Sequence, residues 1–362
     1  FLPSDDDITE RKTRGLGLTR PELSVLISYV KGDLKEQLIR ENVAEDAYLE
    51  DAVTTVFPEK MLKKFEGPMR QHRLKSEIVA TQVANDIFNY MGIAYFNRLQ
   101  ESTGASPVEA AKAYVAARDI FGLHGLWDQI EILDHQIPCE LQSQLMLRTA
   151  RMVRRASRWL VKNYRTGIDI SNVISLYREP VERMIDALET LLPEEQKENW
   201  LKEAAALEEQ GIPADVARRV CASEILYTTL GVIAVAQTQE RDPMLVAQGY
   251  FRVGDALELD NFADQVNSLS VNTHWQAMAR ESFRDDLEWQ QRRITQGLFA
   301  QMEKGSELEP VVTEWLERNT ILVERWLRMM SEIRAVNEPE FSMYSVAIRE
   351  LLDLSQATMP EL

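Results

Sequence analysis

The fold is decided by residues 106–134, SPVEAAKAYVAARDIFGLHGLWDQIEILD, because the chain contains this stretch twice. A shift of 136 residues places it on residues 242–270 without a gap. Eight positions then carry the same residue in both versions: Pro107, Ala111, Tyr114, Asp119, Leu123, Asp128, Gln129 and Leu133. Since a repeat at a fixed spacing marks one structural unit built twice, the sequence predicts an internally duplicated unit.

Both versions read as helices. The first opens with a capping box at residues 106–109 (SPVE), and the second opens with Asp and Pro at residues 242–243. Each is followed by a long helical stretch, over residues 138–166 and residues 274–305. Nowhere do Val, Ile and Thr alternate with polar residues as they do in strands. The sequence therefore predicts an all-α fold, a multi-helix bundle or array with a duplicated unit and no sheet.

Helix signals and breakers divide the rest of the chain. Thr19 and Glu22 form a capping box, and a helix is expected from Met69 to Gly92. Polar residues before position 19 favour a linker or arm. The expected division is 1–18 linker or arm, 19–66 N-terminal helices, 67–168 helical unit 1, 169–210 inserted helical pair, 211–305 helical unit 2 and 306–362 C-terminal helices.

Composition narrows the possible partners and location. A net charge of −17 disfavours binding to nucleic acid or to an anionic membrane surface. No run of about 18 apolar residues is present, so no membrane-spanning helix is expected. The two cysteines give no disulfide framework and favour a reducing, cytoplasmic location. The start lacks an initiator Met and a signal-peptide pattern, which suggests a piece of a longer polypeptide.

The residues indicate no catalytic, cofactor-binding or metal site. Gly15 and Gly17 have no strand before them and no third glycine, unlike a dinucleotide-binding turn. The four histidines share no ligand spacing. Nucleophilic catalysis by a cysteine needs a histidine and a carboxylate beside it. Cys139 follows His135 closely, but it lies in the first turn of an expected helix, and the spacing indicates no carboxylate partner.

The densest charge pattern is a row of arginines at spacings of 3, 4 and 3 on one helix face: Arg148, Arg151, Arg155 and Arg158. Three interpretations compete. The row pairs with acidic helices of the same chain, for example near Asp285 and Asp286. It docks on an acidic neighbouring domain, or it holds an anionic ligand.

A second polar group lies on the helix expected from Met69 and comprises His72, Arg73, Glu77, Gln82, Asn85, Asp86 and Asn89. The apolar residues between them leave the helix little room for an exposed face. We therefore expect some of these side chains, with His72, Glu77, Gln82 and Asn85 as candidates, to form an interior polar network. The alternative is a regulatory module that binds a small effector.

Four separated segments resemble one protein family in order and spacing. They are residues 17–23 (GLTRPEL), 72–81 (HRLKSEIVAT), 117–123 (ARDIFGL) and 154–160 (RRASRWL). They look like the C-terminal region of the very large bacterial NAD-specific glutamate dehydrogenases. The likeness begins at residue 1 and runs to about residue 299, and the last sixty residues are less distinctive.

The resemblance implies a parent enzyme that oxidises L-glutamate to 2-oxoglutarate and ammonium with NAD as cofactor. In that family the catalytic lysine and aspartate and the dinucleotide fold lie upstream of this region. No catalytic or NAD-binding residue is therefore carried over, and no cofactor is expected within this chain. The implied role is a helical accessory domain, inactive alone. Its expected partners are the catalytic domain of the same polypeptide and further copies of the parent enzyme.

Overall fold

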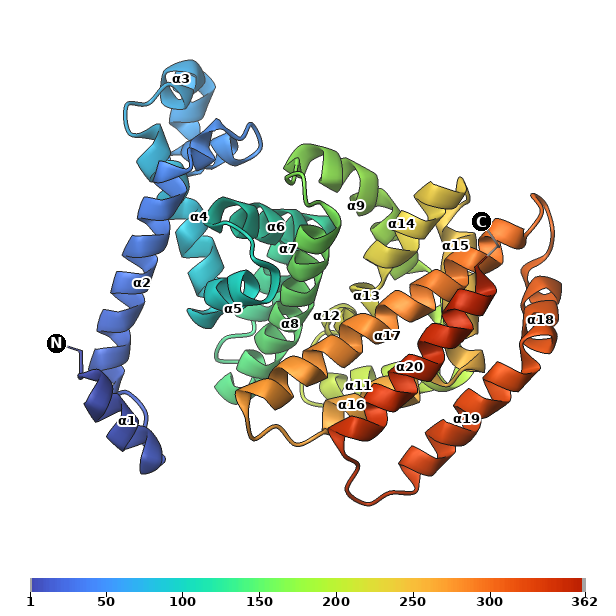
Figure 1. The fold of residues 1–362 in the computed structure, drawn as a ribbon. Helices are drawn as coiled ribbons and strands as arrows, with labels where there is room; N and C mark the ends of the chain where they lie inside the picture. The colour runs from blue at the N-terminus through green and yellow to red at the C-terminus, as the bar shows by residue number, and fades with distance from the viewer. Residues whose placement is uncertain (1, 360–362) are drawn as a thin grey trace. The chain divides into compact units, whose positions relative to one another are not determined.

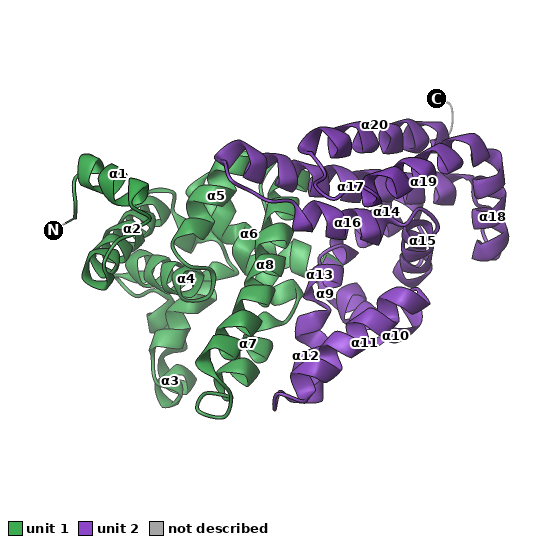
Figure 2. Cartoon of the chain, turned by 90° about the horizontal axis from the view of Figure 1, so that it is seen from below, with its two compact units in different colours: residues 1–176 green, residues 177–362 purple. Residues whose placement is uncertain are grey.

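The structure, a computed structural model, describes residues 2–359. All regular secondary structure in this part of the chain is helical, and it contains no β-strand, which confirms the predicted all-α fold class (Figure 1). Its contacts group into two compact units, residues 1–176 and residues 177–362 (Figure 2). The six-part division expected from the sequence stays a prediction.

Unit 1 holds the helices up to α8, and α9 crosses the boundary between the units. Their bounds are α1 (Asp5–Thr13), α2 (Arg20–Arg40), η1 (Val43–Glu45), η2 (Leu49–Val56), α3 (Glu59–Arg70), α4 (Lys75–Met91), α5 (Ala94–Thr103), α6 (Pro107–Ile120), α7 (Leu123–Glu131), α8 (Cys139–Asn163) and α9 (Ile170–Asp186).

Unit 2 holds the remaining helices. Their bounds are α10 (Leu188–Leu191), α11 (Glu194–Glu208), α12 (Ala214–Cys221), α13 (Ser223–Leu226), α14 (Thr229–Gln239), α15 (Pro243–Ala256), α16 (Leu259–Ser268), α17 (His274–Gln301), α18 (Leu308–Arg318), α19 (Thr320–Arg334) and α20 (Phe341–Thr358).

Helix α6 is the centre of unit 1. Eight of its 14 residues are buried, on all sides of the helix, as in a helix enclosed by others. It contacts α2, α4, α5, α7 and α8. Ser106 caps its N-terminus together with Glu109, as the sequence predicts. The quoted stretch therefore begins with the helix around which unit 1 packs.

In unit 2 the long helix α17 contacts α14, α15, α16, α18 and α20. Buried tryptophans fill the spaces around these helices, and their indole N–H groups have partners. Trp326 donates to the Leu257 carbonyl oxygen at 2.7 Å, and Trp315 donates to Thr358 Oγ1 at 3.0 Å. Pairing of these polar atoms lets large aromatic side chains lie in the core without an unsatisfied donor.

The two units contain helix series of the same order. Helices α5, α6, α7 and α8 correspond in sequence to α14, α15, α16 and α17, and the pairs α5–α6, α6–α8 and α7–α8 contact one another as α14–α15, α15–α17 and α16–α17 do. Left-handed residues fall at matching positions, Gly104 with Glu240 and Gly122 with Glu258. These matches favour duplication, which stays a prediction.

Two local features differ in detail from the sequence expectation. Within the expected linker or arm, residues 5–13 form helix α1, because Ser4 and Asp7 make a capping box that holds the first turn. The helix expected from Met69 begins at Lys75 instead. A turn interrupts it, in which the Leu74 backbone N–H donates to His72 Nδ1 at 3.1 Å. Gly92 ends α4 as expected.

Within residues 2–359, no single helix is both long and apolar enough to cross a bilayer. One bent pair, α12 with residues 223–239, reaches that length and composition only when its two parts are joined across a 47° bend.

Candidate functional site

Unit 1 contains a polar network that joins three segments of the chain. Asp86 comes from α4, while Tyr114, Arg118 and Asp119 come from α6. Tyr48 comes from the start of η2. Arg118 lies one turn after Tyr114, so both side chains leave α6 on one face and can reach Asp86.

Arg118 is the centre of this network. Its Nη1 lies 2.5 Å from Asp86 Oδ2, and its Nε and Nη2 donate to the two carboxylate oxygens of Asp119 at 2.6 and 2.7 Å. Tyr114 donates to Asp86 at 3.0 Å, and Tyr48 donates to Asp119 at 2.7 Å. Each carboxylate thus accepts from one arginine and one tyrosine, an arrangement that satisfies charges within a protein interior.

The electrostatics of the network disfavour acid–base chemistry. Burial raises the pKa of Tyr114, and the negative charge of Asp86 raises it further. Burial acts to lower the pKa of Arg118, but its hydrogen bonds and the charges of Asp119 and Asp86 outweigh this and raise it. A catalytic acid or base needs a pKa near the working pH. Both shifts lead away from neutral pH, so neither Tyr114 nor Arg118 is suited to proton transfer there.

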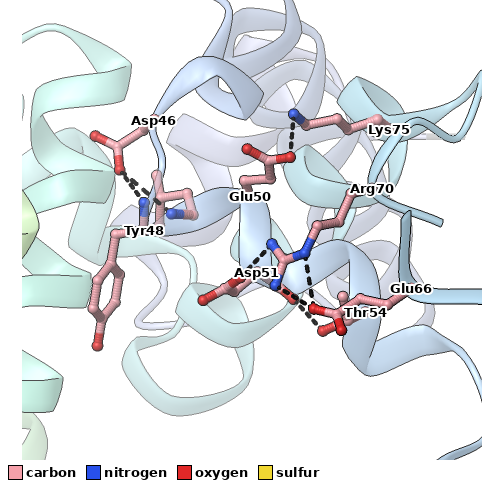
Figure 3. Close-up of polar contacts among 9 residues, drawn as sticks. Asp46, Tyr48, Glu50, Asp51, Thr54, Glu66, Arg70 and Lys75 are labelled. Carbon is pink, nitrogen blue, oxygen red and sulfur yellow. Dashed lines mark hydrogen bonds and ion pairs between the residues drawn. The ribbon is translucent and has the colours of Figure 1, made fainter. Parts of the chain in front are cut away.

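A second set of polar contacts joins α3, η2 and the start of α4 in unit 1 (Figure 3). Arg70 at the end of α3 pairs with Asp51 of η2 at 2.6 Å, and Lys75 at the start of α4 pairs with Glu50 at 2.9 Å. Asp46 accepts backbone N–H groups at the start of η2. Ion pairs at partly exposed positions add little stability individually, and here they join η2 to α3 and α4.

The structure separates the four candidates for a polar network. His72 lies in the turn before α4, with its ring 5.8 Å from that of Phe57. Glu77 is exposed, and Gln82 and Asn85 are half-buried on α4. Within the part of the chain that the structure describes, these four side chains make no hydrogen bond to one another. An interior network forms around Asp86, a neighbour in the same polar group, and the role of the four candidates stays a prediction.

The arginine row lies on α8. Arg151 is exposed, and Arg148, Arg155 and Arg158 are half-buried. The interface role stays a prediction, as does the alternative of an effector-binding module. A shallow hollow of about 420 Å³ opens beside α7 and α8 and is lined by Glu131, Asp134, Gln142, Ser143 and Met146. Its acidic rim does not favour an anionic effector such as an amino-acid carboxylate.

Over residues 2–359, no three His, Cys, Asp or Glu side chains are grouped as a metal ion requires. Cys139 is exposed at the start of α8, Cys221 is buried in α12, and neither forms a disulfide. Burial suits Cys221 to a packing role, because an apolar environment disfavours the reactive thiolate.

Sequence reasoning missed Arg118 and Asp119 as parts of an interior network. A usable signal was present, because the pair stands in a helix whose other residues are mostly Ala, Val and Ile. A charged pair in such a helix must find partners when the helix is enclosed. The partners Asp86 and Tyr48 lie 32 and 71 residues away, so periodicity could not identify them.

Comparison with known proteins gives one consistent result. The family described as "Glutamate dehydrogenase, C-terminal" matches residues 15–353. The chain is 44% identical over 358 residues to the NAD-specific glutamate dehydrogenase of Pseudomonas aeruginosa and 38% identical over 357 residues to that of Halomonas elongata. It is 31% identical over 362 residues to that of Mycobacterium tuberculosis.

In each comparison the alignment covers 99% of this chain but only 22% of the relative. The chain therefore spans about one fifth of the length of the curated relatives it matches. The family match extends over both units and includes α6, the helix that carries the Arg118 network. From this match the chain belongs to the glutamate dehydrogenase C-terminal family.

Proposed function

We propose that the chain is the C-terminal helical domain of a large NAD-specific glutamate dehydrogenase and that it has a structural role there. The parent reaction converts L-glutamate, NAD and water to 2-oxoglutarate, ammonium and NADH. We place catalysis and NAD binding in the upstream part of the polypeptide. We also propose that the parent is a cytoplasmic homo-oligomer.

The observation that carries this proposal is the coverage of the relatives. Identity of 31–44% extends along nearly the whole chain, while 78% of each relative's length lies outside it. The polar network of unit 1 supports a structural role, because Arg118 already occupies both carboxylates of Asp86 and Asp119. Such a network fixes helix positions without offering a group for proton transfer near neutral pH.

The test is a truncation of the full-length enzyme immediately before residue 1. We expect loss of assembly or of thermal stability, with a fall in turnover that follows from it. Unchanged oligomeric mass, melting temperature and turnover would contradict the structural role. The chain alone should not oxidise L-glutamate with NAD, and measurable NADH formation by the purified chain would show that catalysis is not confined to the upstream part.

A further inference from the structure

Helix α2 carries an apolar stripe that unit 1 covers only in part. The stripe consists of Leu23, Leu26, Val30, Leu34 and Leu38, at spacings of three and four residues. Leu34 and Leu38 are buried where α2 packs against α4, α6 and η1. Leu26 and Val30 are half-buried, and Leu23 is 39% exposed. The covered half of the helix thus continues into an uncovered half of the same face.

The uncovered half has a defined shape because α1 is tied to it. Arg11 of α1 donates to Glu22 of α2 at 2.7 Å. Glu22 also accepts from the backbone N–H and the hydroxyl of Thr19, both at 2.8 Å. Hydrogen bonds from Arg11 and then from Thr19 lower the pKa of Glu22 to about 2. We call residues 5–30 the α1–α2 arm, and Figure 1 shows it extending away from α3.

The arm has little apolar packing within unit 1. Helix α1 has nine residues, none of them buried, and a helix this short is marginal in water without packing. Ile8 and Leu16 are 42% and 59% exposed. An ion pair at the surface does not replace apolar burial, since it contributes little by itself. A pair of helices with exposed leucines is suited to a further protein surface.

We propose that the α1–α2 arm is the surface against which the part of the full-length polypeptide preceding residue 1 packs. This inference rests on the proposed function. The relatives are more than four times as long as this chain, and the family that matches is a C-terminal one. The preceding segment therefore enters at the arm itself. Covalent linkage gives it a high effective concentration there, ahead of any separate partner.

The first experiment uses the full-length enzyme with a photo-crosslinking benzoylphenylalanine at Leu23. Ile132 is the control position, because it is 70% exposed in unit 1 and lies outside the arm. We expect Leu23 to crosslink to peptides that precede residue 1, and Ile132 not to do so. Mixing isotopically light and heavy subunits separates crosslinks within one chain from those between copies. Crosslinks only to a second copy, only within residues 1–362, or to nothing would overturn the inference.

The second experiment measures amide hydrogen exchange in the full-length enzyme. Leu23→Asp should accelerate exchange of α1 amides about tenfold or more, since burying one leucine side chain is worth at least that factor. Ile132→Asp should leave α1 exchange unchanged. Equal α1 exchange in the two variants would contradict packing on the arm.

The two proposals fail in different ways. If truncation before residue 1 impairs the enzyme but Leu23 gives no upstream crosslink, the proposed function stands and the arm is not the docking surface. If truncation changes nothing, the structural role itself fails, and an upstream crosslink from Leu23 would then report contact without consequence for the enzyme.

Discussion

Helices α6 and α15 stand at matching places in the two helix series, but they make different contacts with the helices around them. Tyr114 of α6 has its counterpart in Tyr250 of α15, but Gly254 stands where α6 has Arg118. Gln291 of α17 lies against this glycine and donates to the Tyr250 carbonyl oxygen at 2.9 Å. A charged network in one series is thus replaced by close packing of helix on helix in the other.

The aspartate that both series share has different partners in each. Asp119 faces Arg118 and Tyr48 in the interior of unit 1. Asp255 lies at the surface of unit 2 and pairs with Arg252, which also contacts Glu309 of α18. The same residue at matching sequence positions in α6 and α15 therefore does not make the same contacts.

The largest expected effect comes from breaking the charged network. Arg118→Ala leaves Asp86 and Asp119 without their cation in a mostly buried site, so it should lower the free energy of unfolding by about 3–5 kcal/mol. Denaturant titration of the chain, followed by tryptophan fluorescence and circular dichroism, measures this change.

Arg252→Ala is the matched control in the other series. Its side chain is exposed and its ion pairs are at the surface, so the loss should stay below about 1 kcal/mol. Equal effects of the two substitutions would contradict the distinction between an interior network in α6 and a surface pair in α15.

A smaller effect is expected at Gly254. A Cβ atom there would lie 2.6 Å from Gln291 Nε2, so Gly254→Ala must displace an amide that is bonded to the backbone of α15. The expected destabilisation is about 1–3 kcal/mol, typical of an overpacked contact. Gln291→Ala should remove most of the additional cost of Gly254→Ala, because the clash is then absent. A double-mutant cycle measures the coupling, and additive effects would show that the two residues do not contact.

Local signals explain which parts of this fold could be predicted. The capping boxes at Thr19 and Ser106 and the proline before α8 are sequence features that act within a few residues, and the structure places helix starts there. The turn before α4 was missed because it depends on a bond to the His72 ring rather than on a breaking residue. The Arg118 network was missed because its members meet only after folding.

The next effect concerns the backbone at the matching ends of α5 and α14. Gly104 and Glu240 both adopt left-handed angles there, with φ of 74° and 49°. Glutamate is strained in this conformation and glycine is not, although glycine also loses more entropy on folding. Glu240→Gly should therefore stabilise the chain by about 0.5–1 kcal/mol, and Gly104→Ala should destabilise it by about 1 kcal/mol. Thermal unfolding measures both changes in stability. Changes of the same sign would contradict the prediction that the backbones at these two positions are equivalent.

The smallest expected effect is a dependence of stability on pH that comes from Asp260 of α16. This residue stands where α7 has His124. Burial among its neighbours and then the charges of Asp264, Asp255 and Glu195 raise the pKa of Asp260 from 3.8 to about 6. Because the folded chain then binds this proton more tightly than the unfolded chain, Asp260 stabilises the fold as pH falls from about 6 towards 4. The stabilisation is lost as pH rises through 6.

Asp260→Asn tests this pH dependence by removing the titrating group. Asp260 is exposed to solvent, which screens its charge, so the gain in unfolding free energy at pH 7 should be about 1 kcal/mol or less. The difference between pH 7 and pH 5 should shrink in this variant, whereas Asp260→Glu keeps a carboxylate and should retain it. Urea titrations at the two pH values measure the difference. An unchanged difference in Asp260→Asn would place the titration in other groups, such as the neighbouring Asp264, whose pKa burial also raises.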